Sequence, residues 1–346
     1  MQSLALWLCE PTTTAAGITQ SNLQPPTFAS AIEADWLWNF LQRIDAGQPL
    51  LTCAQTLASM LAAEKVALRS WVQTVSELAA QFQSHPTAWP EAQPSVPGFA
   101  WKTFKSLMVA FYEKGLRSGL PYLPDGTPAS TGGVTYASFL QGFRNAHRLN
   151  PDPDAREVCV LCGDKLGQPE VDHWIAKGTF PLLSVCADNL LPICGECNST
   201  ANKGEKAVHS GGSFANWFHP YLRPANGAIR LHYAPPDLKV RCTASVSADQ
   251  SKVDNLDKLL NLSDRWTREF KAEYLNQQGV LRQREQRRID GGRARHTQAE
   301  VQGYIQQVRD DLVPSEPNHE VHQLLCVAMQ EQARLAAWQT ELGLVS

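Results

Sequence analysis

Apolar residues recur at helical spacing over most of the chain. Between residues 31 and 83 one stripe consists of Trp36, Leu37, Phe40, Leu41 and Ile44, and others consist of Leu57, Met60, Leu61, Val66, Leu68, Trp71, Val75 and Leu78. The same spacing returns at 100–116, 134–148, 251–274, 298–312 and 319–342. Residues three and four positions apart share one face of a helix, so these patterns predict mainly helical regions at both ends of the chain.

The middle of the chain has a different pattern. Short β-prone runs at 171–175, 190–193, 228–233 and 239–244 alternate with Gly and Cys. We therefore predict an α+β fold in three parts: a mainly helical N-terminal domain (1–150), a small α+β domain (151–245) and a helical C-terminal region (246–346).

Two segments carry turn signals in place of periodicity. Residues 1–30 contain a Thr run and Pro25-Pro26, and predict an irregular surface arm. Residues 85–98 contain four prolines and predict a linker or exposed loop.

Composition and charge narrow the class of protein. Apolar residues make up 43% of the chain and charged residues 19%, which excludes wholesale disorder. The net charge of −3 gives no global attraction for polyanions. We find no apolar run long enough to span a membrane and no convincing export signal at the start, so we expect a cytoplasmic protein with reduced cysteines.

The cysteines suggest a metal site. Four of the nine form two C-x-x-C pairs, Cys159/Cys162 and Cys194/Cys197. Two such pairs supply four thiolates to a tetrahedral zinc ion, and a zinc with four thiolate ligands has no open position for catalysis. A redox or catalytic thiol pair is the alternative. Thirty-one residues lie between the two pairs, more than in an ordinary zinc ribbon. Since the zinc itself would have no open position, we expect any chemistry to lie in this intervening loop.

The candidate chemical groups in this loop are Asp172, His173 and Asn189, and Asn198 follows directly after Cys197. Asp172 and Asn198 offer the hard oxygen ligands that a hydrated Mg²⁺ prefers. Asp172 is followed by His173, and neighbours on a regular strand point to opposite faces. Both side chains would face one metal only if the strand contained a bulge or bend, or if the site reached around the strand.

The run from Cys159 to Lys203-Gly204 resembles the HNH endonucleases with a ββα-metal core. It contains Cys159-x-x-Cys162, Asp172-His173, Asn189-Leu190 and Cys194-x-x-Cys197-Asn198, and 172–198 reads DHWIAKGTFPLLSVCADNLLPICGECN. Phe218-His219-Pro220-Tyr221 resembles a segment common downstream in one subgroup. The chain departs from the family at Ala176, where Pro is frequent, and in a longer gap before Lys203.

The resemblance implies a role for each matching residue. His173 would be the general base that activates water, and Asp172 and Asn198 would hold one catalytic Mg²⁺ or Mn²⁺. Asn189 would hold the loop and orient the imidazole. The four cysteines would bind structural zinc. Members are frequently bacterial and belong to defence or mobile-element loci.

Other residues have two interpretations each. Asn202 would be a further ligand or a helix cap, and Lys203 a phosphate contact or a solvated side chain. His219 would be functional or packed, whereas His209 and Cys186 are expected to be incidental and Cys242 part of the core. Residues 282–295 hold six Arg against two acidic residues, so Arg284, Arg287 and Arg288 would contact nucleic-acid phosphates or lie on a solvated helix face.

Three functions fit these observations. The first is a metal-dependent HNH endonuclease that nicks or cuts DNA, the second an RNA-cleaving toxin with the same core, and the third a non-catalytic zinc-stapled nucleic-acid-binding module. The expected partners are a DNA or RNA substrate, no membrane, and a second copy through the helical C-terminal region or a regulatory protein.

Overall fold

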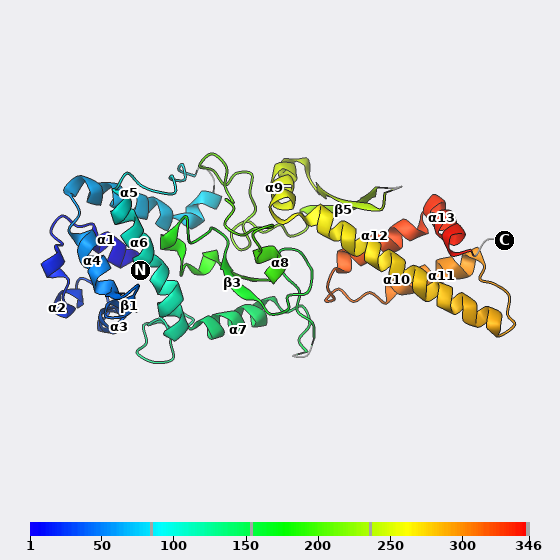
Figure 1. Cartoon of the computed structure of the whole chain (residues 1–346), viewed down its shortest axis with the longest axis horizontal. Helices are drawn as coiled ribbons and strands as arrows, with labels where there is room; N and C mark the ends of the chain where they lie inside the picture. Colours follow the sequence, from blue (N-terminus) through cyan, green and yellow to red (C-terminus); the bar gives the residue numbers. More distant parts are fainter. Residues whose placement is uncertain (84–85, 153–154, 235–236, 344–346) are drawn as a thin grey trace. The chain divides into compact units, whose positions relative to one another are not determined.

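The chain folds into two compact units in a computed structural model that describes residues 1–83, 86–152, 155–234 and 237–343 (Figure 1). Unit 1 comprises 1–147, 170–192 and 204–223, and unit 2 comprises 148–169, 193–203 and the chain from 224 onward. The segment 151–245, predicted as one domain, contributes to both units. The architecture is compatible with the predicted α+β class, since among the described residues helices predominate and the sheets are small, two-stranded pairs.

Unit 1 is mainly helical and carries, among its described residues, two short strand pairs beside its helices. Its helices are α1 (Gln2–Leu8), α2 (Gln20–Leu23), α3 (Ala31–Leu41), α4 (Leu50–Ala58), α5 (Ala62–Ser76), α6 (Gly98–Ala110), which continues as a π-helical segment (Phe111–Leu116), and α7 (Tyr136–His147). β3 (Glu170–His173) pairs with β4 (Leu190–Ile193), and the segment between them contains the 3₁₀ turns Pro181–Leu183 and Ala187–Asn189.

The predicted surface arm at 1–30 is wrong. Residues 2–8 form α1, in which Leu4 and Leu8 are 0% and 1% exposed. α1 packs on α4 and α5. The helix is too short for its periodicity to stand out, and it is held by tertiary packing rather than by its own propensity.

One further expectation for unit 1 is corrected. Ile44 continues the apolar stripe of α3 in the sequence but lies in β1 (Ile44–Asp45), which pairs with β2 (Gln48–Pro49). Ala46 and Gly47 both have positive φ, as a tight two-residue hairpin turn requires.

The proline-rich segment, predicted as a linker or exposed loop, is largely exposed over residues 86–98, and residue 85 lies outside the described residues. Trp89 is 3% exposed, and its backbone N–H donates to the Gly212 carbonyl at 2.8 Å. Gly212 has φ +71°, and a Cβ there would lie 3.0 Å from the Trp89 carbonyl oxygen. Trp89 therefore anchors the segment from 86 to 98 to the rest of unit 1, while most of its other residues are exposed, as predicted for an exposed loop.

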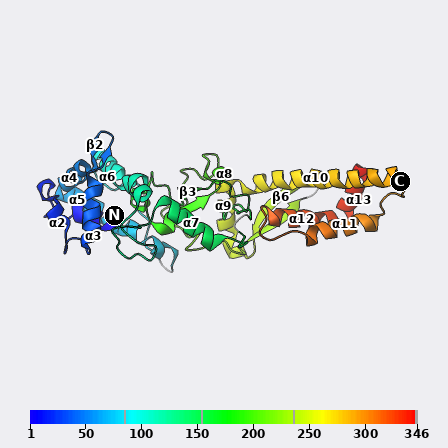
Figure 2. The same cartoon turned by 90° about the horizontal axis from the view of Figure 1, so that it is seen from below.

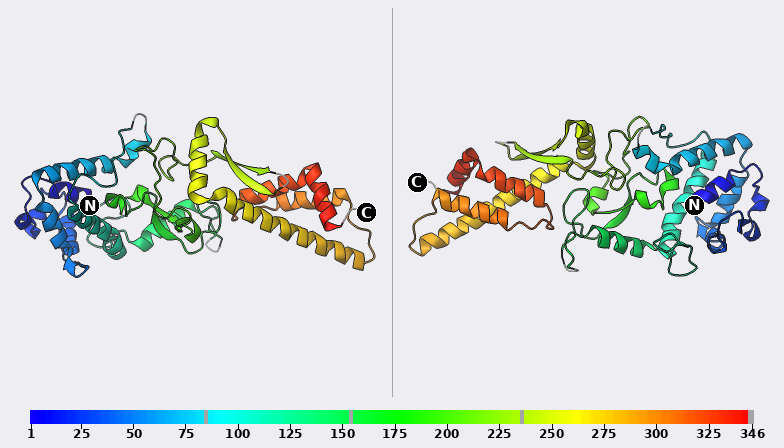
Figure 3. Two further views of the ribbon diagram at one scale, coloured as in Figure 1. Left: turned by 45° about the horizontal axis from the view of Figure 1, so that its top comes forward. Right: turned by 180° about the vertical axis from the view of Figure 1, so that it is seen from behind.

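Unit 2 is built on one long helix. Its elements are α8 (Gly195–Asn198), β5 (Ile229–Ala234), β6 (Lys239–Ala244), α9 (Gln250–Leu260), α10 (Leu262–Asp290), α11 (Gln298–Asp310), α12 (His319–Gln330) and α13 (Gln332–Leu342). Figures 2 and 3 show α11, α12 and α13 along one side of α10. The antiparallel β5–β6 pair packs against the first turns of α10, where Ser263 and Thr267 accept hydrogen bonds from the backbone N–H groups of Cys242 and Val240.

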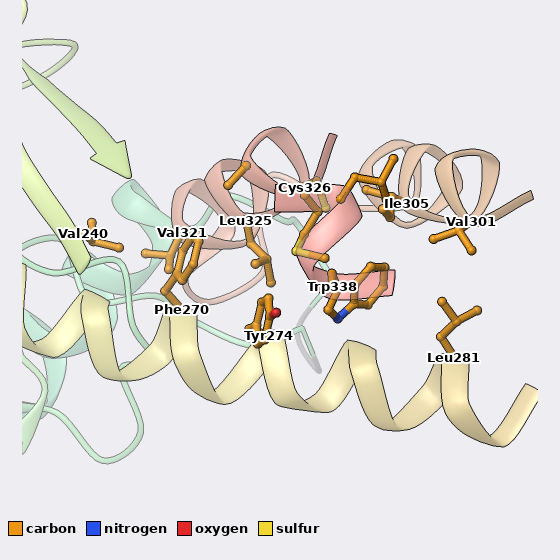
Figure 4. Packing of buried hydrophobic residues seen from close by; sticks show 13 residues of the cluster. Val240, Phe270, Tyr274, Leu281, Val301, Ile305, Val321, Leu325, Cys326 and Trp338 are labelled. Atoms are coloured by element: carbon orange, nitrogen blue, oxygen red, sulfur yellow. The ribbon is translucent and has the colours of Figure 1, made fainter. Parts of the chain in front are cut away.

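The core of unit 2 lies between these helices. Figure 4 shows side chains of α10, α11, α12 and α13 directed toward one another. Phe270, Leu335 and Trp338 are at most 1% exposed. This packing confirms the helices predicted from the apolar spacing after residue 251. Among the described residues, none of the helices has the length and apolar character needed to cross a bilayer.

Candidate functional site

The four predicted cysteine ligands come together in unit 2. The Sγ atoms are 4.0 Å apart for Cys159 and Cys197 and 3.8 Å apart for Cys162 and Cys194, and all four lie within 4.8 Å of one another. Sulfurs bound to one zinc at about 2.3 Å would be about 3.8 Å apart at tetrahedral geometry. All four cysteines are buried, so the cluster has the donors, spacing and enclosure to hold a zinc ion.

Backbone hydrogen bonds shape both halves of the cluster. The Cys159 N–H donates to the Asp164 carbonyl at 2.7 Å, and Gly163, with φ +72°, closes the turn by donating to the Cys159 carbonyl at 2.8 Å. Cys194 caps α8, where its sulfur accepts from the Cys197 N–H at 3.5 Å. Each C-x-x-C pair is therefore held in a tight turn.

Arg265 on α10 is a residue of this centre that the sequence reasoning missed. Its Nη1 donates to the Cys197 sulfur and its Nη2 to the Cys162 sulfur, both at 3.2 Å, and its Nε lies 3.1 Å from the Glu196 carboxylate. Arg265 is 7% exposed. Burial disfavours its charge, but the two sulfurs and Glu196 outweigh that effect and raise the pKa of the guanidinium. A buried cation is what an electron-rich four-thiolate centre needs for balance.

His173, the predicted general base, ends β3 in unit 1 and is 3% exposed. Its Nε2 lies 2.8 Å from the Ser184 carbonyl oxygen. A carbonyl oxygen only accepts, so Nε2 carries the proton, and Nδ1 is then the basic nitrogen of the neutral ring. The Tyr112 ring packs edge-on against the imidazole, with centroids 4.5 Å apart, and the Tyr112 hydroxyl donates to the Val171 carbonyl.

Asn189 uses its whole side chain to hold the segment around His173. Its Oδ1 accepts from the Ile175 N–H at 2.7 Å, while its Nδ2 donates to the carbonyls of Ile175 and Leu183 at 2.9 and 3.2 Å. Ser184, next to Leu183, is 0% exposed, and its Oγ donates to the Met108 carbonyl of α6. The carbonyl that orients the imidazole is thus itself fixed.

The two predicted ligands of the catalytic metal belong to different units. Asp172 lies on β3 of unit 1, half-buried between the buried residues Val171 and His173, in agreement with the alternation of faces expected along a strand. Asn198 is the last residue of α8 in unit 2 and is half-buried. Each offers a hard oxygen donor of the kind Mg²⁺ prefers.

Asn202 and Lys203, which follow α8, are enclosed by protein. Asn202 donates to the Glu196 carbonyl at 2.8 Å and accepts from Asn261 at 2.8 Å, so its amide has a structural role between α8 and the α9–α10 junction. Lys203 is 1% exposed and its backbone N–H donates to the Cys197 carbonyl. A solvated Lys203 side chain is therefore excluded, and a phosphate contact there stays a prediction that needs the side chain to become accessible.

His219 is packed in unit 1. It is 0% exposed, and its Nδ1 accepts from the backbone N–H groups of Tyr221 and Leu222, both at 3.2 Å. Burial and the nearby Arg223 lower the pKa of His219 to about 4, so the ring is neutral at neutral pH. The Tyr221 hydroxyl donates to the Leu190 carbonyl of β4 at 2.8 Å. The Phe218–Tyr221 segment therefore braces the strand pair.

The sequence predicts no chemical role for Cys186, Cys242 and His209. Burial raises the pKa of the Cys186 and Cys242 thiols, the latter to about 12, which makes neither a good nucleophile. Burial also lowers the pKa of His209, which packs edge-on against Phe180.

The arginine-rich stretch forms the end of α10 and the loop after it. Arg288 pairs with Glu300 at 2.8 Å and donates to the Ala294 carbonyl, and the Arg284 guanidinium lies 4.5 Å from the centre of the Tyr304 ring. Arg287 is exposed. Two of the three predicted phosphate contacts are therefore also engaged in packing the C-terminal helices.

Comparison with known proteins adds no relative: no family model matches the chain, and no match was found among curated proteins or solved structures. The four-cysteine cluster is compatible with a zinc knuckle.

Two contacts of the candidate site could not be found from the sequence. A helix far along the chain supplies Arg265, and a main-chain carbonyl orients His173. No local motif marks either of them.

Proposed function

We propose that the protein is a metal-dependent endonuclease of the HNH type that hydrolyses phosphodiester bonds in DNA. The contact that carries the proposal is the hydrogen bond from His173 Nε2 to the Ser184 carbonyl, because it leaves Nδ1 as a base in a fixed ring.

Three further observations support the proposal. The order of elements along the chain is β3, β4 and α8, two strands and then a helix. The four-cysteine cluster encloses the start of α8 and would hold Asn198 on a rigid element. Asn189 braces the segment that carries the carbonyl partner of His173.

In the proposed mechanism, His173 Nδ1 accepts a proton from water as the water oxygen attacks phosphorus, and the bond from phosphorus to the 3′ oxygen breaks. The resemblance to HNH endonucleases assigns the oxygen atoms of Asp172 and Asn198 as ligands of a divalent cation. When bound, that cation would supply positive charge for the phosphate and the leaving oxygen. The zinc would have a structural role only, since its four thiolates leave no open position.

The test is cleavage of supercoiled plasmid by the purified chain with Mg²⁺, with Mn²⁺ and with EDTA. His173→Gln is the informative variant, since its Nε2 can still donate to the Ser184 carbonyl while the side chain has no basic nitrogen. Loss of a general base lowers rates by about 10²–10⁴-fold. His232→Ala, at an exposed position of β5, is the matched control.

We expect metal-dependent nicking or linearisation by the wild type and by His232→Ala, and its loss in His173→Gln at unchanged thermal stability. Undiminished cleavage by His173→Gln would contradict the proposed base. Cleavage of total RNA but not of plasmid would assign the same chemistry to RNA, and no cleavage of either would refute the enzyme.

A further inference from the structure

Unit 1 contains a pocket of about 600 Å³ that the proposed chemistry does not use. Its apolar lining comes from Phe28, Trp36, Leu37, Phe111, Leu120 and Leu182. Four of these side chains are at most 7% exposed and belong to the core of unit 1, namely Phe28, Leu37, Phe111 and Leu182. A pocket of this volume and lining is of the size that encloses a small organic molecule.

The Glu33 carboxylate and the α-amino group of Met1 both belong to residues that line the pocket. Glu33, in the first turn of α3, lines it and accepts a hydrogen bond from the hydroxyl of Tyr122, which also lines it. A carboxylate can accept about four hydrogen bonds, so Glu33 has capacity for a ligand donor. Burial lowers the pKa of the Met1 α-amino group to about 6 against the opposing attraction of Glu33, so this amine is largely neutral at pH 7. In the described part of the chain, no lysine or arginine pairs with Glu33. A partly desolvated carboxylate in an apolar pocket favours a cation over an anion.

The far wall of the pocket is the segment that holds His173. Leu182, Leu183 and Val185 line the pocket, and Ser184 lies between them. The Ser184 carbonyl accepts from His173 Nε2, and the Leu183 carbonyl accepts from Asn189. A molecule in the pocket would therefore contact the residues on either side of Ser184, whose carbonyl orients the imidazole.

We propose that this pocket binds a small amphipathic amine, with an aromatic or aliphatic body on the apolar lining and its ammonium group at Glu33, and that His173 senses its binding through the 182–185 segment. The binding site does not depend on the nuclease proposal, because both readouts below are measured without cleavage.

The probe is 4-(aminomethyl)biphenyl, and biphenyl-4-carboxylate is its anionic counterpart. Titration calorimetry on the full chain measures their affinities for the wild type, Glu33→Gln and Ala29→Trp. Ala29 is exposed and lines the pocket, so a Trp there fills the space without entering the core. Asp35→Asn, an exposed position on the same helix outside the pocket, is the matched control.

We expect saturable binding of the amine by the wild type and by Asp35→Asn, at least ten-fold tighter than that of the carboxylate. Glu33→Gln should abolish this preference, and Ala29→Trp should abolish binding. No saturable binding of the amine, equal affinity for the two probes, or binding unaffected by Ala29→Trp would each overturn the site.

The second readout is the imidazole signal of His173 in a chain labelled with ¹⁵N-histidine, assigned by its disappearance in His173→Gln. The amine should shift this signal in the wild type and leave it unchanged in Ala29→Trp. Binding without such a shift would refute the coupling to His173.

Discussion

Replacing Arg265 with Met should weaken zinc binding while leaving the packing of α10 in place. Met has a similar length and no donors, so the change removes the hydrogen bonds to the sulfurs of Cys162 and Cys197 and the ion pair with Glu196. Because Arg265 is 7% exposed, water cannot readily replace these contacts.

The expected loss of zinc affinity follows from which atoms accept the hydrogen bonds of Arg265. Two of them end on the sulfurs that would bind the metal, and loss of such partners typically costs about 10–100-fold in metal affinity, or about 1.4–2.7 kcal/mol. Arg268 provides the contrast, since it lies one turn along α10 and contacts the same Glu196 carboxylate at 3.3 Å. Its side chain is 68% exposed, so its ion pair should contribute about 0–1 kcal/mol.

The assay is competition for zinc between the full chain and a chromogenic chelator, with Arg265→Met, Arg268→Met and the wild type compared at one pH. A Cys194→Ser variant measures background binding by the other cysteines. We expect Arg265→Met to release zinc at about 10–100-fold lower chelator concentration and Arg268→Met to shift less than about five-fold. The loss of zinc affinity in Arg265→Lys should be smaller than in Arg265→Met and larger than in Arg268→Met, because one ammonium group cannot make both of the hydrogen bonds that the guanidinium makes.

Equal zinc retention by Arg265→Met and the wild type would refute the reasoning, since it would show that the guanidinium contributes nothing to the thiolate centre. Equal losses in the two Met variants would refute it as well, by assigning the effect to the common partner Glu196. Urea unfolding of the zinc-loaded variants separates a loss of metal affinity from a general loss of stability.

Three further outcomes can be measured on single variants. Asn189→Ala takes the partner from the Ile175 N–H and carbonyl, while the Leu183 carbonyl keeps the Cys186 N–H, so the change should cost about 2 kcal/mol or more in urea unfolding. Since the pKa of His219 is lowered to about 4, the unfolded chain gains a proton below about pH 6.5 that the folded chain does not. Stability should therefore fall by up to about 3 kcal/mol as the pH is lowered from 6.5 to 4, and His219→Asn should flatten this dependence. Arg287→Gln should weaken DNA binding in a salt-dependent manner without loss of stability, whereas Arg288→Gln should lower the melting temperature; unchanged binding by Arg287→Gln would make this stretch a solvated face.

Local patterns predicted what local interactions decide. The helices after residue 251 and the strands at 190–193 and 239–244 lie where apolar spacing and β-propensity place them. The four-cysteine cluster was predictable for a related reason, since the geometry of a C-x-x-C turn depends on four consecutive residues. α1 escaped prediction because it is buried by helices more than forty residues away, which no window of its own sequence contains.

The contacts that give the candidate site its chemistry are long-range or made by the main chain. Arg265 reaches Cys197 across 68 positions of sequence, and nothing in its neighbours distinguishes it from Arg268. Their difference is only which face of α10 each occupies. A basic residue on a helix can therefore be a metal-site partner or a solvated charge, and burial decides between the two.

The orientation of His173 shows why a matched motif does not by itself establish a general base. Any residue at position 184 supplies a carbonyl, so the identity of Ser184 bears on the imidazole only through its Oγ, which ties the segment to Met108. The protonation pattern of the ring thus depends on where a backbone segment lies, and that segment is also a wall of the apolar pocket. Because the residues on either side of Ser184 line the pocket, the proposed coupling between pocket occupancy and the candidate base requires only that this short segment shift.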